Sequence, residues 1–179
     1  MDVGTVDSYW QSHMDLLSPN PPLKLYDRRW VIHTRTEERP PVRFPEAASV
    51  YASMITDGCF IEAGARVESS VLSPGVIVRP GAVIRESILL TDCVVERGAV
   101  VERTVLDKQV HVGENVHIGG GVHQPEIKVA LVGKNSRLPN GLVVEPGGEI
   151  STDVVEEDFD EMYVKAGQLI KTKQKSYNV

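Results

Sequence analysis

Aliphatic residues from position 50 onwards recur with a spacing that neither a helix nor a plain strand produces. The steps between them run 5, then 6, 6 and 5 in repetition, so the pattern returns every 17 residues. A helix repeats every 3.6 residues and a strand every 2, so neither element alone explains the spacing. The series comprises Val50, Ile55, Ile61, Val67, Leu72, Val78, Ile84, Leu89, Val95, Val101, Leu106, Val112 and Ile118.

Aligned on the 17-residue period, these residues fall into three columns. They are Ile55, Leu72, Leu89 and Leu106; Ile61, Val78, Val95 and Val112; and Val67, Ile84, Val101 and Ile118. A separate column holds residue types that tolerate positive φ at a sharp corner, namely Gly64, Gly81, Gly98 and Asn115. Small hydroxyl residues mark the shortened edge, at Ser53, Ser70, Ser87 and Thr104. The pattern predicts an all-β triangular prism whose coils stack about 4.8 Å apart and stabilise one another.

The repeat is interrupted after Ile118, because His123 stands where an aliphatic residue is due. Glycines and a proline in residues 119–131 indicate an inserted loop. The period then resumes for one further coil at Val132, Leu138, Val144 and Ile150. We therefore expect a β-helix domain over residues 50–150, followed by a cap and C-terminal tail over 151–179.

Two segments precede the repeat. Residues 5–17 have apolar side chains at helical spacing, with Thr5 as a plausible N-cap, and Ser18 with the prolines after it ends that helix. Residues 18–49 are rich in proline and arginine and predict an ordered strap. We therefore expect one short helix within 1–17 and a strap or linker over 18–49.

Composition excludes several function classes. A net charge of −6 argues against general nucleic-acid binding. No run of eighteen apolar residues predicts a membrane span, and the N-terminus does not resemble a signal peptide, so we expect a cytoplasmic protein. Cys59 and Cys93 share a column two coils apart, which is too far for a disulfide, so we expect reduced core residues.

His111, His117 and His123 follow one another at intervals of six and invite a zinc hypothesis. In a triangular prism six residues turn the chain by about a third of a revolution, so His111 and His117 should lie on different faces. A hexapeptide-repeat acyltransferase, which would use a loop histidine such as His123, stays an alternative function.

The 17-residue period gives neither the hand of the β-helix nor the function, and a family resemblance indicates both. The hexads at 61–66 (IEAGAR) and 78–83 (VRPGAV) resemble the repeat of left-handed parallel β-helices, which implies that hand. Residues 2–10 (DVGTVDSYW) resemble the end of a sugar-nucleotidyltransferase domain. The strap and coil segments resemble bacterial glucose-1-phosphate adenylyltransferase at 25–30 (LYDRRW), 39–44 (RPPVRF), 104–108 (TVLDK) and 132–135 (VGKN).

The resemblance implies the C-terminal regulatory and oligomerisation part of that enzyme, which makes ADP-glucose and pyrophosphate from ATP, glucose 1-phosphate and magnesium for glycogen synthesis. Asp2 matches a carboxylate that helps hold magnesium, but one carboxylate is an incomplete site. No glycine-rich phosphate loop is present, so we expect no catalytic residue here, no activity from this chain alone, and an absent nucleotidyltransferase domain. The implied assembly is a homotetramer. The same part of another sugar-1-phosphate nucleotidyltransferase, such as a mannose-1-phosphate guanylyltransferase, stays an alternative.

Lys108 and Lys134 match lysines that contact anionic effectors, a sugar phosphate or AMP, in this family. Lys108 comes two residues after Leu106, and Lys134 comes two residues after Val132. If the inserted loop returns the chain to the same edge, the two lysines stack on successive coils and form an effector-binding site.

Overall fold

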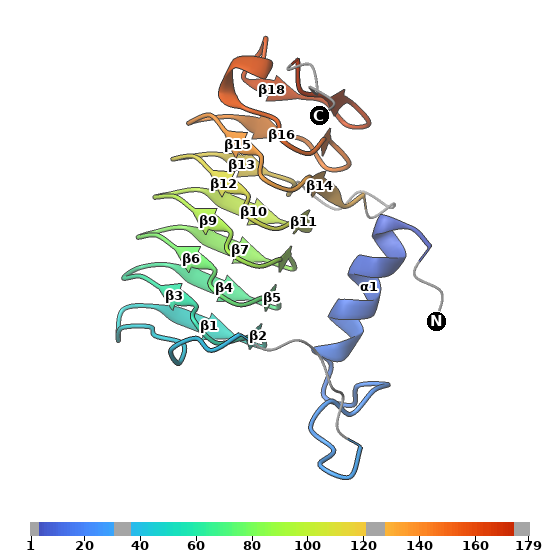
Figure 1. Cartoon of the computed structure of the whole chain (residues 1–179), viewed down its shortest axis with the longest axis vertical. Coiled ribbons are helices and arrows are strands. Elements are labelled where there is room, and N and C mark those ends of the chain that lie inside the picture. The colour runs from blue at the N-terminus through green and yellow to red at the C-terminus, as the bar shows by residue number, and fades with distance from the viewer. Residues whose placement is uncertain (1–3, 31–36, 121–127, 174–179) are drawn as a thin grey trace.

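The chain folds into a stack of parallel β-coils with an α-helix along its side (Figure 1). This computed structural model describes residues 4–30, 37–120 and 128–173. The first five coils each contribute a short strand to three sheets, the last two coils contribute strands to two of them, and the strand pairings are parallel. The predicted all-β fold is therefore confirmed.

We name the three sheets after their first strands. The β1 sheet contains β1 (Ser49–Tyr51), β4 (Arg66–Glu68), β7 (Val83–Arg85), β10 (Val100–Glu102), β13 (His117–Ile118), β16 (Val143–Val144) and β18 (Tyr163–Val164). The β2 sheet contains β2 (Met54–Ile55), β5 (Val71–Leu72), β8 (Ile88–Leu89), β11 (Thr104–Leu106), β14 (Ala130–Val132), β17 (Glu149–Ile150) and β19 (Leu169–Ile170). The β3 sheet contains β3 (Phe60–Ile61), β6 (Ile77–Val78), β9 (Val94–Val95), β12 (His111–Val112) and β15 (Arg137–Leu138).

The predicted aliphatic columns are the interior of the prism. Leu72 pairs with Leu89 and Leu89 with Leu106 in the β2 sheet, and the other two columns align in the same way. Nearly all of these side chains are fully buried and form one continuous core. The resumed period is confirmed as well, because Leu106 pairs with Val132.

Hydroxyl side chains build the corner between the β1 and β2 sheets. The backbone N–H of Ser87 donates to Ser70 Oγ at 3.1 Å, and Ser87 Oγ donates to the Arg85 carbonyl at 2.7 Å. Ser70 and Thr104 repeat this arrangement one coil below and one coil above. The hydroxyl side chains therefore form hydrogen bonds with backbone N–H and carbonyl groups at a turn where no neighbouring strand provides them.

The corner after the β3 sheet uses left-handed backbone, as the sequence predicts. Gly64, Gly81, Gly98 and Asn115 all have positive φ, between 54° and 76°. Glycine adopts this conformation without a steric cost, and asparagine is among the few other residues that tolerate it.

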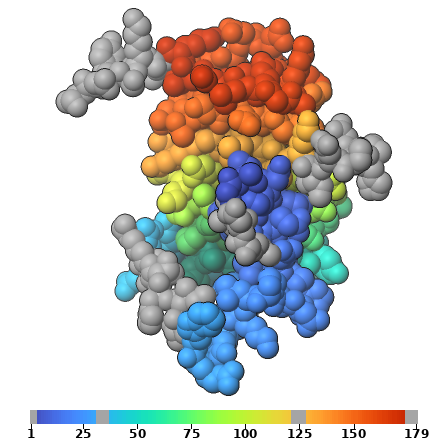
Figure 2. Space-filling model, turned by 90° about the vertical axis from the view of Figure 1, so that its right-hand side faces the viewer, coloured from blue at the N-terminus to red at the C-terminus, as the bar shows by residue number. Residues whose placement is uncertain are grey.

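Helix α1 (Val6–Leu16) is confirmed and lies along the outer face of the β2 sheet (Figures 1 and 2). Thr5 caps it, accepting a hydrogen bond from Ser8 N–H. Trp10 is buried against Ile88 and Val105, and its indole N–H donates to the Glu86 carbonyl at 2.5 Å. The helix therefore packs through its apolar stripe. Its assignment to the end of a nucleotidyltransferase domain stays a prediction.

The C-terminal region differs from the predicted cap. β18 and β19 continue the β1 and β2 sheets, so the solenoid extends to Ile170. The final coil is longer than 17 residues because the 3₁₀ helix η1 (Glu156–Asp158) is inserted into it. Asp158 is buried there and accepts hydrogen bonds from the backbone N–H groups of Val155 and Lys173. Because of this extra length, the aliphatic residues of the last coil do not follow the 17-residue period, and the sequence pattern did not predict the coil.

The strap joins the first coil at its open edge. Arg43 forms a parallel bridge with Phe60, and the Gly58 N–H donates to the Pro40 carbonyl at 2.6 Å. Strap residues 40–43 therefore extend the β3 sheet by one position. None of the helices in the described parts of the chain has the length and apolar character needed to cross a bilayer.

Candidate functional site

The two lysines singled out from the sequence lie on adjacent coils at the corner between the β2 and β3 sheets. The Lys108 carbonyl accepts a hydrogen bond from the Asn135 N–H at 3.0 Å, and the Asp107 N–H donates to the Val132 carbonyl at 2.9 Å. These bonds place Lys108 and Lys134 in register. The inserted segment therefore returns the chain to the same edge, as the stacking hypothesis requires.

We call this pair, with the turns 107–110 and 133–136, the lysine corner. Thr91 lies one coil below Lys108, since its carbonyl accepts from the Gln109 N–H at 2.9 Å. On the other side, the Lys134 carbonyl accepts from the Asp153 N–H at 2.8 Å. The paired positive charge is therefore confined to two coils.

Both lysines project into solvent. Within residues 4–30, 37–120 and 128–173, no carboxylate lies within ion-pair distance of either ammonium group. The nearby carboxylates are held by other groups: Asp107 Oδ1 accepts from the Lys108 backbone N–H, and Asp153 Oδ1 accepts from Asn135 Nδ2. The lysine corner thus presents two uncommitted cations side by side.

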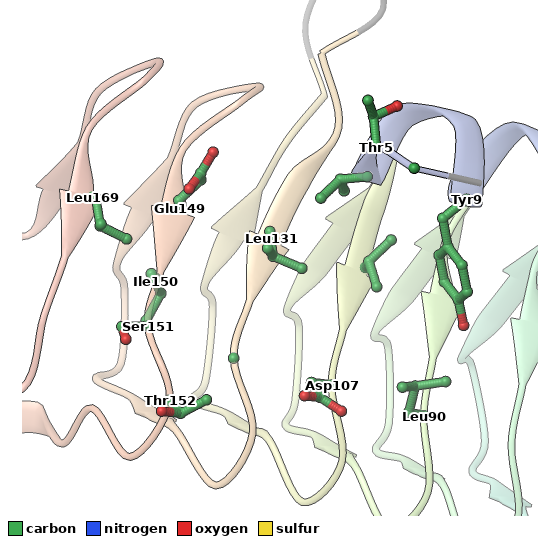
Figure 3. A pocket seen from close by; sticks show the side chains of 14 residues that line it. Thr5, Tyr9, Leu90, Asp107, Leu131, Glu149, Ile150, Ser151, Thr152 and Leu169 are labelled. Carbon is green, nitrogen blue, oxygen red and sulfur yellow. The ribbon is translucent and has the colours of Figure 1, made fainter. Parts of the chain in front are cut away.

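A groove of about 650 Å³ lies next to the lysine corner, between α1 and the upper part of the β2 sheet (Figure 3). Its floor is apolar: Val105 and Leu131 are register partners on adjacent coils, and Leu90 lies one coil below Asp107. Polar groups line its rim, and burial together with the Asp107 carboxylate raises the pKa of the Tyr9 hydroxyl. The lining residues are Gly4, Thr5, Val6, Tyr9, Leu90, Val105, Asp107, Leu131, Gly133, Glu149, Ile150, Ser151, Thr152 and Leu169.

The groove itself contains no lysine or arginine among these lining residues. Asp107 and Gly133 belong to the groove, and the next residue along the chain in each case is a lysine of the corner. Anions are therefore favoured at the corner and not on the groove floor. Sequence reasoning missed the groove, although the apolar residues that precede core positions in the β2 sheet, Val71, Ile88, Val105 and Leu131, were a signal for a covered outer face.

The histidines do not form a site in the described structure. His111 belongs to the β3 sheet and His117 to the β1 sheet, which confirms the predicted separation. His111 Nε2 lies 3.2 Å from Glu96 Oε1. His123 lies outside the described residues. Within those residues no group of three or more histidine, cysteine or acidic side chains is placed to hold a metal ion.

The cysteines are buried and free, as predicted. Burial raises the pKa of the Cys93 thiol to about 12 and raises the pKa of Cys59 as well. A thiol with a raised pKa is a poor nucleophile. Asp2, the predicted magnesium ligand, lies outside the described residues.

Comparisons with known proteins agree with the resemblance found in the sequence. Residues 40–127 match the family model described as GlmU-like, C-terminal hexapeptide. This supports the left-handed course of the β-helix. Curated relatives named glucose-1-phosphate adenylyltransferase include one from Thermomicrobium roseum, 53% identical over 60 residues, which is 34% of this chain and 14% of the relative.

Two further relatives carry the same name. The protein from Corynebacterium kroppenstedtii is 45% identical over 41% of this chain and 18% of its own length. The protein from Pseudothermotoga lettingae is 47% identical over 41% of this chain and 17% of its own length. The predicted resemblance is thus confirmed. The matched stretches span only 14–18% of the length of these relatives, so the comparison covers a small part of each.

Proposed function

We propose that this chain is the C-terminal regulatory and oligomerisation part of a glucose-1-phosphate adenylyltransferase that acts in cytoplasmic glycogen synthesis. The observation that carries the proposal is the identity of 45–53% to three proteins of that name. The same name in all three favours this enzyme over other sugar-1-phosphate nucleotidyltransferases. The lysine corner supports the regulatory role.

The proposed effector is a small anion, a sugar phosphate or AMP, held between Lys108 and Lys134. Two ammonium groups about 4.8 Å apart at the backbone repel each other mildly in water. A phosphate between them replaces that repulsion with two charge-assisted hydrogen bonds. Because both lysines are exposed, binding to this chain alone should be weak and should decrease with salt.

Catalysis is assigned to the nucleotidyltransferase domain of the parent protein. That domain supplies the ATP phosphate loop and the second carboxylate that Asp2 would need to hold magnesium. These 179 residues contain no such loop. The chain on its own therefore does not form ADP-glucose.

The proposed oligomerisation surface is the end of the prism at β1 and β2, where strap residues cover only the β3 sheet. Phe44 and Tyr51 are exposed there, at 52% and 72%, and Val50 is only partly buried. Uncovered strand edges with exposed apolar side chains favour pairing with another chain. The occupant we propose is a second copy, within a homotetramer of the parent protein.

One experiment tests the assignment of chemistry. The purified chain is mixed with ATP, glucose 1-phosphate and magnesium, and pyrophosphate release is followed. We expect no turnover above background for the chain alone, and turnover once it is joined to the nucleotidyltransferase domain of a relative. Turnover by the chain alone, or an inactive fusion that is folded, would contradict the proposal.

A further inference from the structure

A strap arginine reaches into the same corner from the coils below the two lysines. Arg39 Nη1 lies 2.6 Å from Asp92 Oδ1, and Nη2 lies 3.1 Å from Asp92 Oδ2. Glu37 contacts the same guanidinium, with Oε2 at 2.8 Å from Nη2. This two-point pairing of guanidinium with carboxylate fixes both distance and orientation. It connects residues far apart in the sequence.

The corner provides a cradle for the Arg39 side chain. A Cβ at Gly58 would lie 3.0 Å from Arg39 Cδ, and a Cβ at Gly75 would collide with Arg39 Nη1. Both glycines have positive φ, of 75° and 78°. Arg39 therefore lies along the corner over Gly58 and Gly75, which have no side chains, and its guanidinium reaches Asp92 on the next coil up.

Asp92 is close to the lysine corner. Its neighbour Thr91 lies directly below Lys108, since the Thr91 carbonyl accepts from the Gln109 N–H at 2.9 Å. One coil and one residue separate Asp92 from Lys108, which is about 6 Å at the backbone. At that distance an unpaired carboxylate opposes anion binding at Lys108. Arg39 supplies the positive charge that offsets it.

We propose that Arg39 is a positioning residue that couples docking of the strap to anion binding at the lysine corner, a regulatory role that rests on the proposed effector site. With the strap docked, Arg39 pairs with Asp92 on the side of the lysines and with Glu37 of the strap itself, so the Asp92 charge next to Lys108 is offset. With the strap released, Asp92 offsets part of the lysine charge and the anion binds less tightly. Coupling between two binding events is reciprocal, so a bound anion stabilises the docked strap.

If Arg39 acts through its charge, removing the Asp92 charge as well should cancel the effect of removing Arg39. If Arg39 acts only through packing, it should not. We would compare Arg39→Ala, Asp92→Asn and the double variant by titrating each chain with glucose 1,6-bisphosphate and, separately, AMP at about 20 mM salt. Arg39→Ala should weaken binding about threefold to tenfold, because it exposes the Asp92 charge. The double variant should bind as the original chain does. Unchanged binding by Arg39→Ala, or a double variant as weak as Arg39→Ala, would overturn the proposal.

A matched control exists on another sheet. Arg85 also bridges two carboxylates, Glu68 and Glu102, but on the β1 sheet. Arg85→Ala should leave anion binding unchanged. An equal loss in this variant would mean that any arginine substitution weakens binding, and would overturn the specific role of Arg39.

Hydrogen exchange separates failure of the coupling from failure of the effector site. The Gly58 N–H, which donates to the Pro40 carbonyl, should exchange faster in Arg39→Ala without any ligand, and either anion should slow it in the original chain. Binding of an anion with no change at Gly58 would refute the coupling and leave the effector site standing. If no anion binds at all, the effector site and the coupling are both wrong, whatever Gly58 shows.

Discussion

Lys108 and Lys134 lie in register on adjacent coils, although the coils below Lys108 in this corner are 17 residues apart and the inserted segment separates these two lysines by 26. A direct continuation of the repeat would have placed a different residue above Lys108. The insertion thus brings two cations together at one corner. The chemical consequence is a local positive charge in a chain whose net charge is −6.

A charge in the core tests the inward register. Val95 is fully buried in the middle of the stack, and we expect Val95→Asp to abolish folding. A buried unpaired carboxylate costs several kcal/mol against a typical total stability of about 5–15 kcal/mol. The measurement is circular dichroism with thermal melting.

The neighbouring residue provides the control. Val94 is adjacent in β9 but faces outward and is only partly buried. Val94→Asp should fold, since side chains in a strand alternate between faces. Soluble Val95→Asp protein with an unchanged melting temperature would show that the register is wrong.

The reactivity of the two buried thiols tests whether the core of the prism is packed. Burial raises the pKa of Cys93 to about 12, and that of Cys59 is also raised, so neither is a thiolate at pH 8. We expect iodoacetamide to modify neither residue in the folded chain and both in guanidinium. Mass spectrometry gives the count, and fast labelling of either thiol under native conditions would contradict the packed core.

Acid should loosen the last coil before the rest. Two backbone hydrogen bonds, from Val155 and Lys173, hold the pKa of the Asp158 carboxyl below its ordinary value. A lowered folded-state pKa contributes stability that is present above about pH 4 and is lost as the pH falls through the folded value. Hydrogen exchange near η1 should therefore speed up below about pH 4 more than exchange in the central coils.

Asp158→Asn separates this cause from general acid unfolding. The amide keeps an acceptor oxygen but does not titrate in this range. We expect the variant to exchange faster near η1 at neutral pH and to lose the extra acid sensitivity there. An acid response near η1 that is identical in the variant would assign the effect to another group.

The sequence predicted the inward-facing part of this structure well, because every coil must bury the same kind of side chain at the same place. The Leu72, Leu89 and Leu106 column and the corner glycines follow from that rule. The stacking of Lys108 and Lys134 was predicted on the condition that the inserted segment returns the chain to the same edge, and the structure meets that condition.

Contacts on the outside of the prism could not be predicted from the sequence. The Arg39–Asp92 pair depends on the path of the strap, which no periodicity records. The groove beside α1 depends on how far the helix covers the β2 sheet. The last coil escaped detection because η1 lengthens it beyond the repeat.

The most direct test of the account is anion binding at the lysine corner. The isotopically labelled chain is titrated with glucose 1,6-bisphosphate or AMP at low salt, and the backbone amides are followed by NMR. Lys108→Glu is compared with Lys24→Glu, which makes the same charge change at an exposed strap position away from the corner. We predict that the amides of residues 107–110 and 133–136 shift first, and that Lys108→Glu alone abolishes the shifts. Shifts centred elsewhere, or equal binding by both variants, would contradict the account.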